Sequence, residues 1–337
     1  MNRRDFLKIA ASAVPLAGTP AKFQPEIAFT FDDPKIVGGA GLSWQEINHR
    51  ILEVLDKRKV KVVLFVCGKR VDSVEGQRLI AEWDLAGHDI GNHSYSHLNF
   101  NASGDASSDG TIVTLTNFEA DTLKGEALVH DYSHFVRLFR FPFFKEGDTV
   151  EKRDGMRSFL RQHGYRIGRA TVDASDWAIN TRLENRVRQN SKADLSPYRD
   201  FFLQHIWERA QFYESLAERV PKHPVRHTVL LHHNPLNAFF LDDLVSMFAA
   251  RGWKRIDADW AYADPVYSLQ PDILPAGESL IWQLAKQTGK FERELRYPGE
   301  DDVYENPKMD ALRLCPQLLG TGGQVSFSFF LLDGRAR

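Results

Sequence analysis

Residues 27–33 read IAFTFDD, an apolar run that ends in two adjacent carboxylates, and this stretch begins the pattern that decides the fold. A second apolar run lies at Val60–Val66, and the segment between the two, Trp44–Lys57, has its apolar residues at helical spacing. The two runs predict buried strands, and the segment between them predicts a helix that joins them.

The same alternation continues as far as Ile256. Further helices are expected over 76–86, 117–136, 156–163, 200–219 and 241–250, and further strands over 138–141, 165–167, 228–231 and 253–256. Such alternation implies parallel strands joined by right-handed crossovers. With this many units we expect an α/β fold in which the strands form a closed or partly closed (β/α) barrel rather than an open sheet.

The composition is that of a globular protein with a large core. Of the 337 residues 43% are hydrophobic and 26% are charged, and the formal net charge is −2, so the chain has no basic excess suited to nucleic acid. Cys67, one of two cysteines, lies inside an apolar run and is expected to be a small core residue rather than half of a disulfide.

The N-terminus differs in composition from the rest of the chain. Arg3 and Arg4 precede a short apolar stretch and then small residues up to Ala21. This order is typical of a twin-arginine export signal, and the apolar stretch is too short to span a bilayer; a disordered basic tail is the alternative. We therefore expect an exported protein, periplasmic or secreted, with a signal at 1–21, a barrel at 22–256 and a C-terminal extension of unknown role at 257–337, in which 278–288 predicts a helix.

Two fragments near the predicted strand ends offer metal ligands. Asp32 and Asp33 follow the first strand, and His93 and His97 have the i, i+4 spacing that puts two imidazoles on one face of a helix. One aspartate and two histidines would hold a divalent ion with open positions, and the second aspartate would be left to act as a base. Taken alone, an aspartate pair after a strand is more often a helix cap or a turn.

A second histidine pair with the same spacing lies at His130 and His134. Spacing does not separate the two pairs, but context does. His93 follows residues 87–92, which we interpret as a tight strand-to-helix turn, whereas His130 lies late in the long helix expected over 117–136. We interpret His130 and His134 as structural or surface residues.

Three more fragments could complete a hydrolytic site. Arg140 lies at a strand end, where its planar fork could fix a carboxylate, although alone it would be read as a surface arginine. Asp176 and Trp177 offer a carboxylate beside a large ring, and His232 ends an apolar strand. A histidine held by a buried carboxylate has a raised pKa and can act as a general acid.

The order and composition of these fragments resemble the polysaccharide deacetylases of the NodB-homology type, the family 4 carbohydrate esterases. The resemblance spans residues 26–256 and rests on five motifs, which are 30–33, 93–97, 140–143, 173–177 and 230–232. It implies a distorted (β/α) barrel, a divalent metal, which is usually Zn²⁺ and sometimes Co²⁺ or another transition ion, and removal of acetyl groups from a glycan. By matching position it implies that Asp33, His93 and His97 are ligands, Asp32 the base, Arg140 its orienting partner, Asp176 and Trp177 the supports of the acid, and His232 the acid.

Two positions depart from the motifs of that family. Phe143 stands where tyrosine is usual, but the role implied there is largely a backbone contact to the oxyanion. His233 stands where aspartate is common; we expect it to be a spectator, and the alternative is that it perturbs His232 by like-charge repulsion.

The glycan is left open by the sequence, as is the choice between N-acetyl groups, which we favour, and O-acetyl esters. Two other classes stay open: a hydrolase of small cyclic amides on a related barrel, and a non-catalytic glycan-binding relative. The export signal disfavours the first, and the complete set of motif residues disfavours the second.

Overall fold

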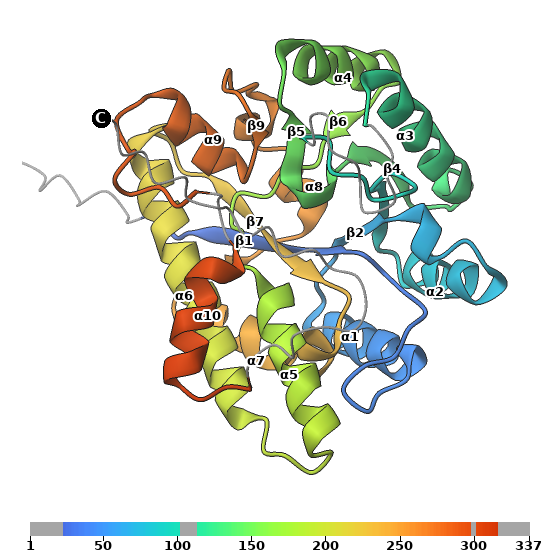
Figure 1. Cartoon of the computed structure of the whole chain (residues 1–337), viewed down its shortest axis with the longest axis vertical. Helices are drawn as coiled ribbons and strands as arrows, with labels where there is room; N and C mark the ends of the chain where they lie inside the picture. Colours follow the sequence, from blue (N-terminus) through green and yellow to red (C-terminus); the bar gives the residue numbers. More distant parts are fainter. Residues whose placement is uncertain (1–22, 102–112, 298–300, 316–337) are drawn as a thin grey trace, which may run out of the picture.

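The computed structural model describes residues 23–101, 113–297 and 301–315, and its centre is a curled parallel sheet (Figure 1). The strands lie in the order β6-β4-β3-β2-β1-β7, and β8 pairs with the start of β1. Their bounds are β1 Glu26–Asp32, β2 Val63–Val66, β3 Asp89–Asn92, β4 Phe135–Phe139, β6 Arg166–Ile167, β7 Arg226–His232 and β8 Lys254–Arg255.

The two edges of this sheet approach each other through one short segment. Residues 166–167 pair with β4, and the N–H of Gly168 donates to the carbonyl of Phe139 at 2.7 Å. A few residues later Val172 forms a parallel bridge with Val229 of β7. One connection therefore contacts both edges, and the expectation of a distorted (β/α) barrel is confirmed.

Helices surround the sheet, as Figure 1 shows. The longer ones are α1 Trp44–Arg58, α2 Val74–Leu85, α3 Leu115–Val129, α4 Val150–Gln162, α5 Asp176–Gln189, α6 Ser196–Arg219 and α7 Pro235–Ala250. The start of α1 is fixed locally, because the Ser43 side chain accepts from the Glu46 N–H and the Glu46 carboxylate accepts from the Ser43 N–H. The apolar face of α1, with Ile47, Ile51 and Leu55 buried, covers the sheet.

Several predicted boundaries were wrong. The helix expected over 117–136 ends at Val129, and β4 begins at Phe135. The turn between them is stabilised by Asp84 on α2, whose carboxylate accepts the N–H groups of Ser133 and His134 at 3.2 and 2.7 Å. This turn depends on a contact between residues about fifty positions apart, and local periodicity does not contain that information.

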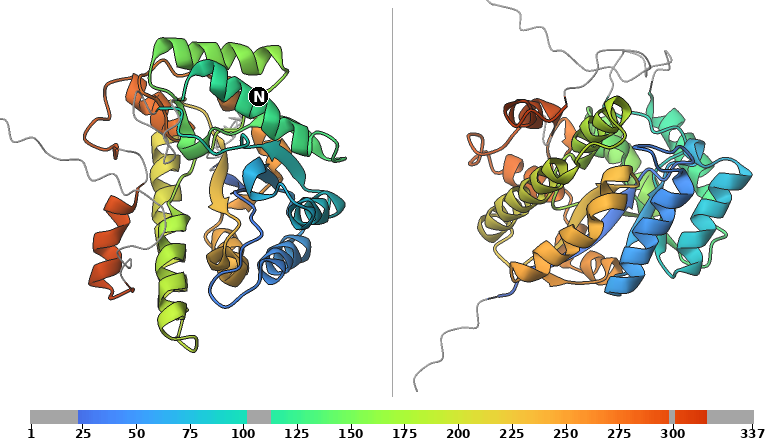
Figure 2. Two further views of the ribbon diagram at one scale, coloured as in Figure 1. Left: turned by 45° about the vertical axis from the view of Figure 1, so that its right-hand side comes forward. Right: turned by 90° about the horizontal axis from the view of Figure 1, so that it is seen from below.

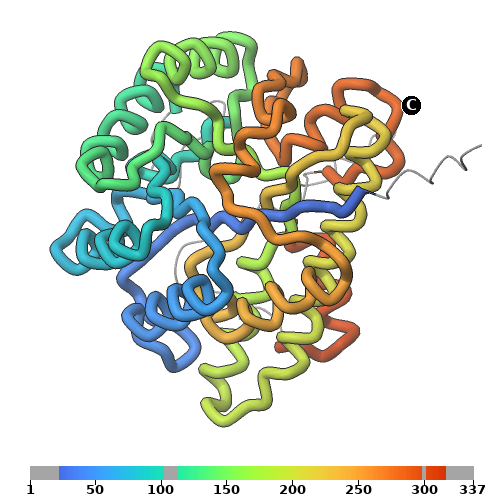
Figure 3. The backbone as a smooth tube through the Cα atoms, turned by 180° about the vertical axis from the view of Figure 1, so that it is seen from behind, coloured from blue at the N-terminus to red at the C-terminus, as the bar shows by residue number. Residues whose placement is uncertain are grey.

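Residues after Ile256 pack against the same core as the barrel. Helix α8 Ala258–Tyr262 lies across the N-terminal ends of β1 and β7 (Figure 3), and η3 Pro265–Ser268 follows it. The two-residue strand β9 (Ala276–Gly277) pairs antiparallel with β5 (Lys145–Gly147), which directly follows the 3-10 turn η2 (Pro142–Phe144) in the chain. Helix α9 spans Leu280–Gln287. Helix α10 (Asp302–Ala311) lies on the outside next to α5 and α6 (Figure 2).

Some sequence-based expectations lie outside the described residues. These are the export signal at 1–21 and the part of the C-terminal extension after residue 315. Within the described ranges, no helix combines the length and apolar character needed to cross a membrane.

Candidate active site

The candidate site lies at the C-terminal ends of the central strands. Asp32 is the last residue of β1, and in the sheet it lies opposite Phe65 of β2 and His232 of β7. Asn92 ends β3, and Arg140 directly follows β4. Parallel strands end at one edge of the sheet, so the register alone brings four of the five sequence fragments together.

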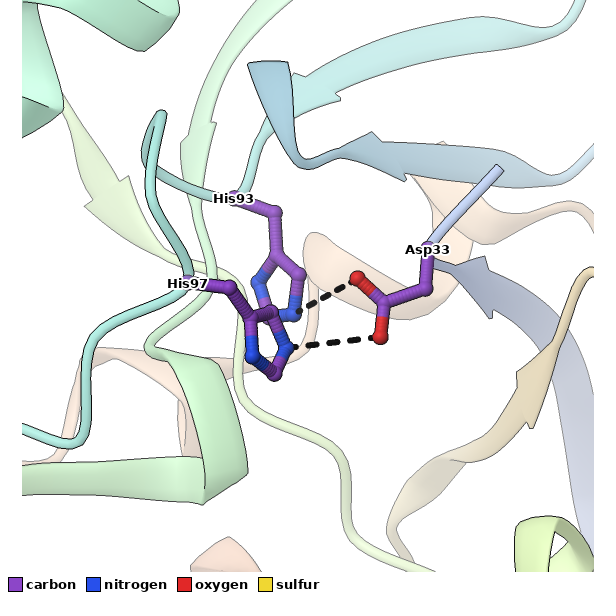
Figure 4. Close-up of side chains that lie close together, drawn as sticks. All are labelled: Asp33, His93 and His97. Carbon is purple, nitrogen blue, oxygen red and sulfur yellow. Dashed lines mark ion pairs between the residues drawn. The ribbon is translucent and has the colours of Figure 1, made fainter. Parts of the chain in front are cut away.

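Asp33, His93 and His97 form a compact group that could hold a metal ion (Figure 4). The Nε2 atom of His97 lies 3.3 Å from Asp33 Oδ2, and the Nε2 atom of His93 lies 3.9 Å from Asp33 Oδ1. Asp33 is 7% exposed and His93 2%, and Asp33 Oδ1 accepts no hydrogen bond from the described part of the chain. A buried carboxylate oxygen without a donor, facing two imidazoles, fits a divalent cation.

The loop that carries the two histidines is not the helix that their spacing predicted. Ser94 and His97 have positive φ angles of 62° and 58°, which interrupt a helix. Asn92 Oδ1 accepts the Ser94 N–H at 2.9 Å, and the Asp121 carboxylate on α3 accepts the N–H groups of Tyr95 and Ser96. Side-chain acceptors thus replace helical hydrogen bonds, and the folded loop turns both rings toward Asp33.

Backbone contacts fix the tautomer of His93. Its Nδ1 lies 2.8 Å from the carbonyl oxygen of Arg140, which can only accept, so Nδ1 carries the proton. The Nε2 lone pair therefore faces the carboxylates, with Asp32 Oδ2 at 3.6 Å. Burial holds the pKa of His93 well below its usual value, which keeps the ring in the neutral form that metal binding requires.

A buried arginine fixes the other carboxylate of the pair. Arg140, 1% exposed, donates from Nη1 to Asp32 Oδ1 at 2.6 Å and from Nε to the Gly168 carbonyl at 2.7 Å. Its guanidinium lies 4.0 Å from the centre of the Phe65 ring. This arginine is held on both edges of its planar fork and on one face, so it is not the surface residue that composition alone would suggest.

The two adjacent aspartates have opposite pKa shifts. Burial raises the pKa of Asp32 to about 6, although Arg140 opposes the rise. Burial also raises the pKa of Asp33, but His97 and Arg70 outweigh it, so the net pKa lies well below the usual value. The pair is therefore divided into one firmly ionised carboxylate between the imidazoles and one carboxylate that can exchange a proton near neutral pH.

His232 is held by Asp176, the first residue of α5. Its Nδ1 lies 2.5 Å from Asp176 Oδ1, and its backbone N–H donates to Asp176 Oδ2 at 3.0 Å. The side-chain amides of Asn234 and Asn237 donate to the same Oδ2 at 3.2 and 2.7 Å. Burial lowers the pKa of His232, but the attraction of Asp176 is stronger and raises it to about 9, which leaves a protonated imidazole with Nε2 free of Asp176.

Of the two remaining predicted site residues, Phe143 is exposed beside the metal-ligand group and Trp177 is partly buried in the core. Phe143, 54% exposed and with φ of +55°, places its ring 4.5 Å from that of His97, so it forms part of the rim. Trp177 is the second residue of α5 and packs, partly buried, against the main core beside Asp176.

His130 and His134, which we interpreted as structural or surface residues, have partners other than Asp33, His93 and His97. His134 pairs with Asp84, with Nδ1 at 3.0 Å from Oδ1, and His130 is near Asp131 on the surface. His233 points to the other side of β7, where its Nε2 lies 3.1 Å from Asn48 Oδ1, and burial lowers its pKa to about 3. A neutral ring in that position does not repel the charge of His232.

Sequence reasoning missed four side chains that contact the site. Arg70, just after β2, lies 2.9 Å from Asp33 Oδ2, and Tyr262 contacts Arg140. The amides of Asn234 and Asn237 hold Asp176. The one available signal was Asn234 itself, an N-cap residue two positions after the end of β7, whose side chain accepts from the Asn237 N–H. The other contacts depend on packing between distant segments.

Comparisons with known proteins agree with the motifs. Residues 20–168 match the family model for polysaccharide deacetylases. No curated protein sequence matches the chain. Similar solved structures include a CE4 family pseudoenzyme from Bacillus anthracis, with 22% identity over 71% of this chain and 65% of that chain and a TM-score of 0.47. A chitin deacetylase from the fungal pathogen Colletotrichum lindemuthianum is similar at 16% identity, over 72% of this chain and 89% of that chain, with a TM-score of 0.48.

A peptidoglycan deacetylase from Bacillus subtilis is similar at 19% identity, over 71% of this chain and 90% of that chain, with a TM-score of 0.43. Because these identities are low and the TM-scores are below 0.5, the assignment rests on the family model and the motifs. Over residues 20–168, less than half of its length, this chain matches the polysaccharide deacetylase family.

Proposed function

We propose that this protein is a metal-dependent deacetylase that hydrolyses acetyl groups, N-acetyl groups above all, from a glycan. The observation that carries the proposal is the pairing of Asp32 and His232. The two residues lie opposite each other on neighbouring strands, beside the group Asp33, His93 and His97. One is a carboxylate whose pKa is raised to about 6 and the other an imidazole whose pKa is raised to about 9.

Asp33, His93 and His97 would hold the metal, which we expect to be Zn²⁺, with Co²⁺ or another transition ion as the alternative. Two imidazoles and one carboxylate are a common ligand set for a hydrolytic zinc ion. When bound, such an ion lowers the pKa of a water molecule and polarises a carbonyl group. The neutral Nε2 of His93 and the ionised Asp33 are already in the protonation states that this requires.

Asp32 would take the proton from the attacking water. Its Oδ1 is engaged by Arg140, which leaves Oδ2 as the proton acceptor. Arg140 fixes the orientation of the carboxylate and keeps its pKa from rising further, because a nearby cation favours the ionised form.

His232 would give a proton to the departing amine or alcohol. Asp176 accepts from Nδ1, so the transferable proton is on Nε2, and the side chain is 20% exposed. Asp176 has the role of a positioning carboxylate, because it fixes the tautomer and stabilises the protonated ring. The backbone near Phe143 would stabilise the oxyanion, and Trp177 would support Asp176.

Export is a separate proposal that rests on residues 1–21 alone. The paired Arg3 and Arg4 followed by a short apolar stretch support passage through the twin-arginine machinery. Replacing both arginines by lysine should retain the protein in the cytoplasm, and unchanged export would contradict the proposal.

The function is tested by measuring acetate released from N-acetylchito-oligosaccharides and from acetylated xylan. Release should vanish with a chelator and return when Zn²⁺ or Co²⁺ is added. His93→Ala should abolish both metal binding and release, whereas His130→Ala, from the second histidine pair of the same spacing, should change neither. A fully metal-loaded protein that releases no acetate from either glycan would contradict the proposal and favour small cyclic amides or a non-catalytic glycan-binding role.

A further inference from the structure

Tyr262 reaches the candidate site from outside the segment that matches the family model. It is the last residue of α8, which lies across the N-terminal ends of β1 and β7 (Figure 3), whereas the catalytic edge is at the C-terminal ends of the strands. Its side chain is buried, 2% exposed, and extends into the barrel as far as Arg140. The matched segment ends at residue 168, so the family assignment does not account for this contact.

The contact completes the set of groups that hold the guanidinium. Nε of Arg140 donates to the Gly168 carbonyl, Nη1 donates to Asp32, and Nη2 donates to the Tyr262 hydroxyl at 2.9 Å. Each nitrogen of the fork therefore has its own acceptor. Without the hydroxyl, Nη2 would have no acceptor at that position, in a place where water is largely excluded.

Tyr262 is itself held from two sides. Its hydroxyl donates to the carbonyl of Arg169 at 3.3 Å, so the oxygen is left to accept from Arg140. Its own carbonyl accepts from Arg166 Nη1 at 2.9 Å, and its ring packs against that of Tyr267 with 4.8 Å between centroids. A side chain fixed at both ends can orient the group that it binds.

We propose that Tyr262 is a positioning residue for the reaction, which acts by fixing Arg140 and, through it, the general base Asp32. This inference rests on the proposed function. Tyr262 lies behind Arg140 and is buried below the catalytic edge, so it does not itself act on the substrate. The segment after the barrel thereby supplies part of the catalytic apparatus, and loss of the hydroxyl lowers the rate of the chemical step rather than substrate binding.

Tyr262→Phe tests the proposal, with Tyr267→Phe as its matched control. Each change removes one buried hydroxyl, and the two tyrosines are neighbours whose rings contact each other at a tilt of 59°. Tyr267, however, donates to the Arg226 carbonyl and contacts the Thr228 hydroxyl, away from Arg140. We expect Tyr262→Phe to lower kcat for acetate release about tenfold, the order of one hydrogen bond to a charged group, with KM and metal content unchanged. Tyr267→Phe should leave kcat within about twofold.

A second measurement separates this inference from the proposed function. Proton–nitrogen NMR of the guanidinium groups, with the Arg140 signals assigned by their absence in Arg140→Lys, reports directly how firmly the fork is held. Wild-type protein and Tyr267→Phe should show slow rotation of the Arg140 Nη groups, and Tyr262→Phe should show fast rotation. This readout needs no substrate, so it remains decisive if the wild-type protein releases no acetate.

Equal kcat values for the two tyrosine variants in an active enzyme would overturn the inference. Unchanged Arg140 signals in Tyr262→Phe would also overturn it. A fall in thermal stability common to both variants, with no difference in kcat, would show that Tyr262 has only a structural role.

Discussion

Replacing Asp176 by Asn should move the basic limb of the pH profile and lower the rate. Asp176 raises the pKa of His232 from its ordinary 6.5 to about 9. A net difference of about 2.5 in pKa corresponds to roughly 3 kcal/mol in favour of the protonated ring, after the opposing effect of burial has been overcome. In Asp176→Asn the attraction is lost while burial still disfavours the charged ring, so the pKa of His232 should fall to 6.5 or below.

The size of the effect follows from the protonated fraction. At pH 7.5 nearly all His232 rings are protonated in the wild-type protein, whereas at a pKa of 6.5 about one-tenth are. The kcat for acetate release should therefore fall at least about tenfold at pH 7.5. The loss should be smaller at pH 6, because there more of the variant's histidine is protonated. The amide also no longer fixes the His232 tautomer, which adds to the loss.

The assay is kcat against pH from 6 to 10 for wild type, Asp176→Asn and Asp84→Asn. Asp84 is the matched control, because it also holds a histidine, His134, but away from the site. Its variant should keep the basic limb near pH 9. If Asp176→Asn also kept that limb near pH 9, the assignment of His232 as the acid would be refuted.

Two further predictions concern stability. Glu146 is buried and accepts hydrogen bonds from Arg169 through both carboxylate oxygens at 2.6 Å. Glu146→Gln should therefore lower the free energy of unfolding, measured by urea denaturation, by about 3 kcal/mol. Glu53→Gln, at an exposed position, should leave the free energy of unfolding nearly unchanged. Burial raises the pKa of Glu146, but Arg169 outweighs burial, so the net pKa lies below the usual 4.5. The stabilisation from this ion pair is therefore present above pH 4.5 and is lost as pH falls through the folded-state pKa. The same loss of stability with falling pH in Glu146→Gln as in wild type would contradict this. Gly277 has φ of +145°, and an added Cβ would lie 2.3 Å from the Phe144 carbonyl oxygen. Gly277→Ala should therefore lower the free energy of unfolding by about 2 kcal/mol, and it should lower kcat/KM by displacing the turn that carries Phe143. Gly252→Ala is the control, because Gly252 also has a positive φ but an added Cβ there would meet no neighbouring atom, so kcat/KM should not change. Equal kcat/KM values for the two variants would refute the argument.

The sheet could be predicted from the sequence because its central strands are buried on both faces. In β2 all four residues from Val63 to Val66 are buried, so the strand reads as an unbroken apolar run. Helix α1 was equally readable, since its apolar face is regular and Ser43 marks its start. Where local signals and the folded environment agree, pattern and structure coincide.

Helix α5 was not predicted because its buried face mixes polar with apolar side chains. Arg182 is buried and donates to Asn306 and Asp310 of α10, and Asn180 and Asn185 are buried as well. The apolar residues on that face, Ile179 and Leu183, are interrupted by these polar ones, and for Arg182 the neighbouring segment supplies the hydrogen-bond acceptors. That partner lies more than one hundred residues later in the chain, so the pattern of α5 itself does not indicate a helix.

The site residues were found through their order along the chain, but their local structure was not. The spacing of His93 and His97 suggested a helix, whereas Asn92 and Asp121 fold that stretch into a loop with two positive φ angles. Tyr262 carries no local signal at all. Its relevance arises only because α8 crosses the end of the barrel and brings the hydroxyl to Arg140.

The most direct test of the account is a comparison of Asp32→Asn with Asp33→Asn, measuring metal content and acetate release in both. The two changes are chemically identical and lie one residue apart, yet the structure gives them different partners. The account predicts that Asp32→Asn retains the metal and loses turnover, whereas Asp33→Asn loses both. Normal turnover in Asp32→Asn, or full metal content in Asp33→Asn, would contradict the division into one base and one ligand on which the proposed function depends.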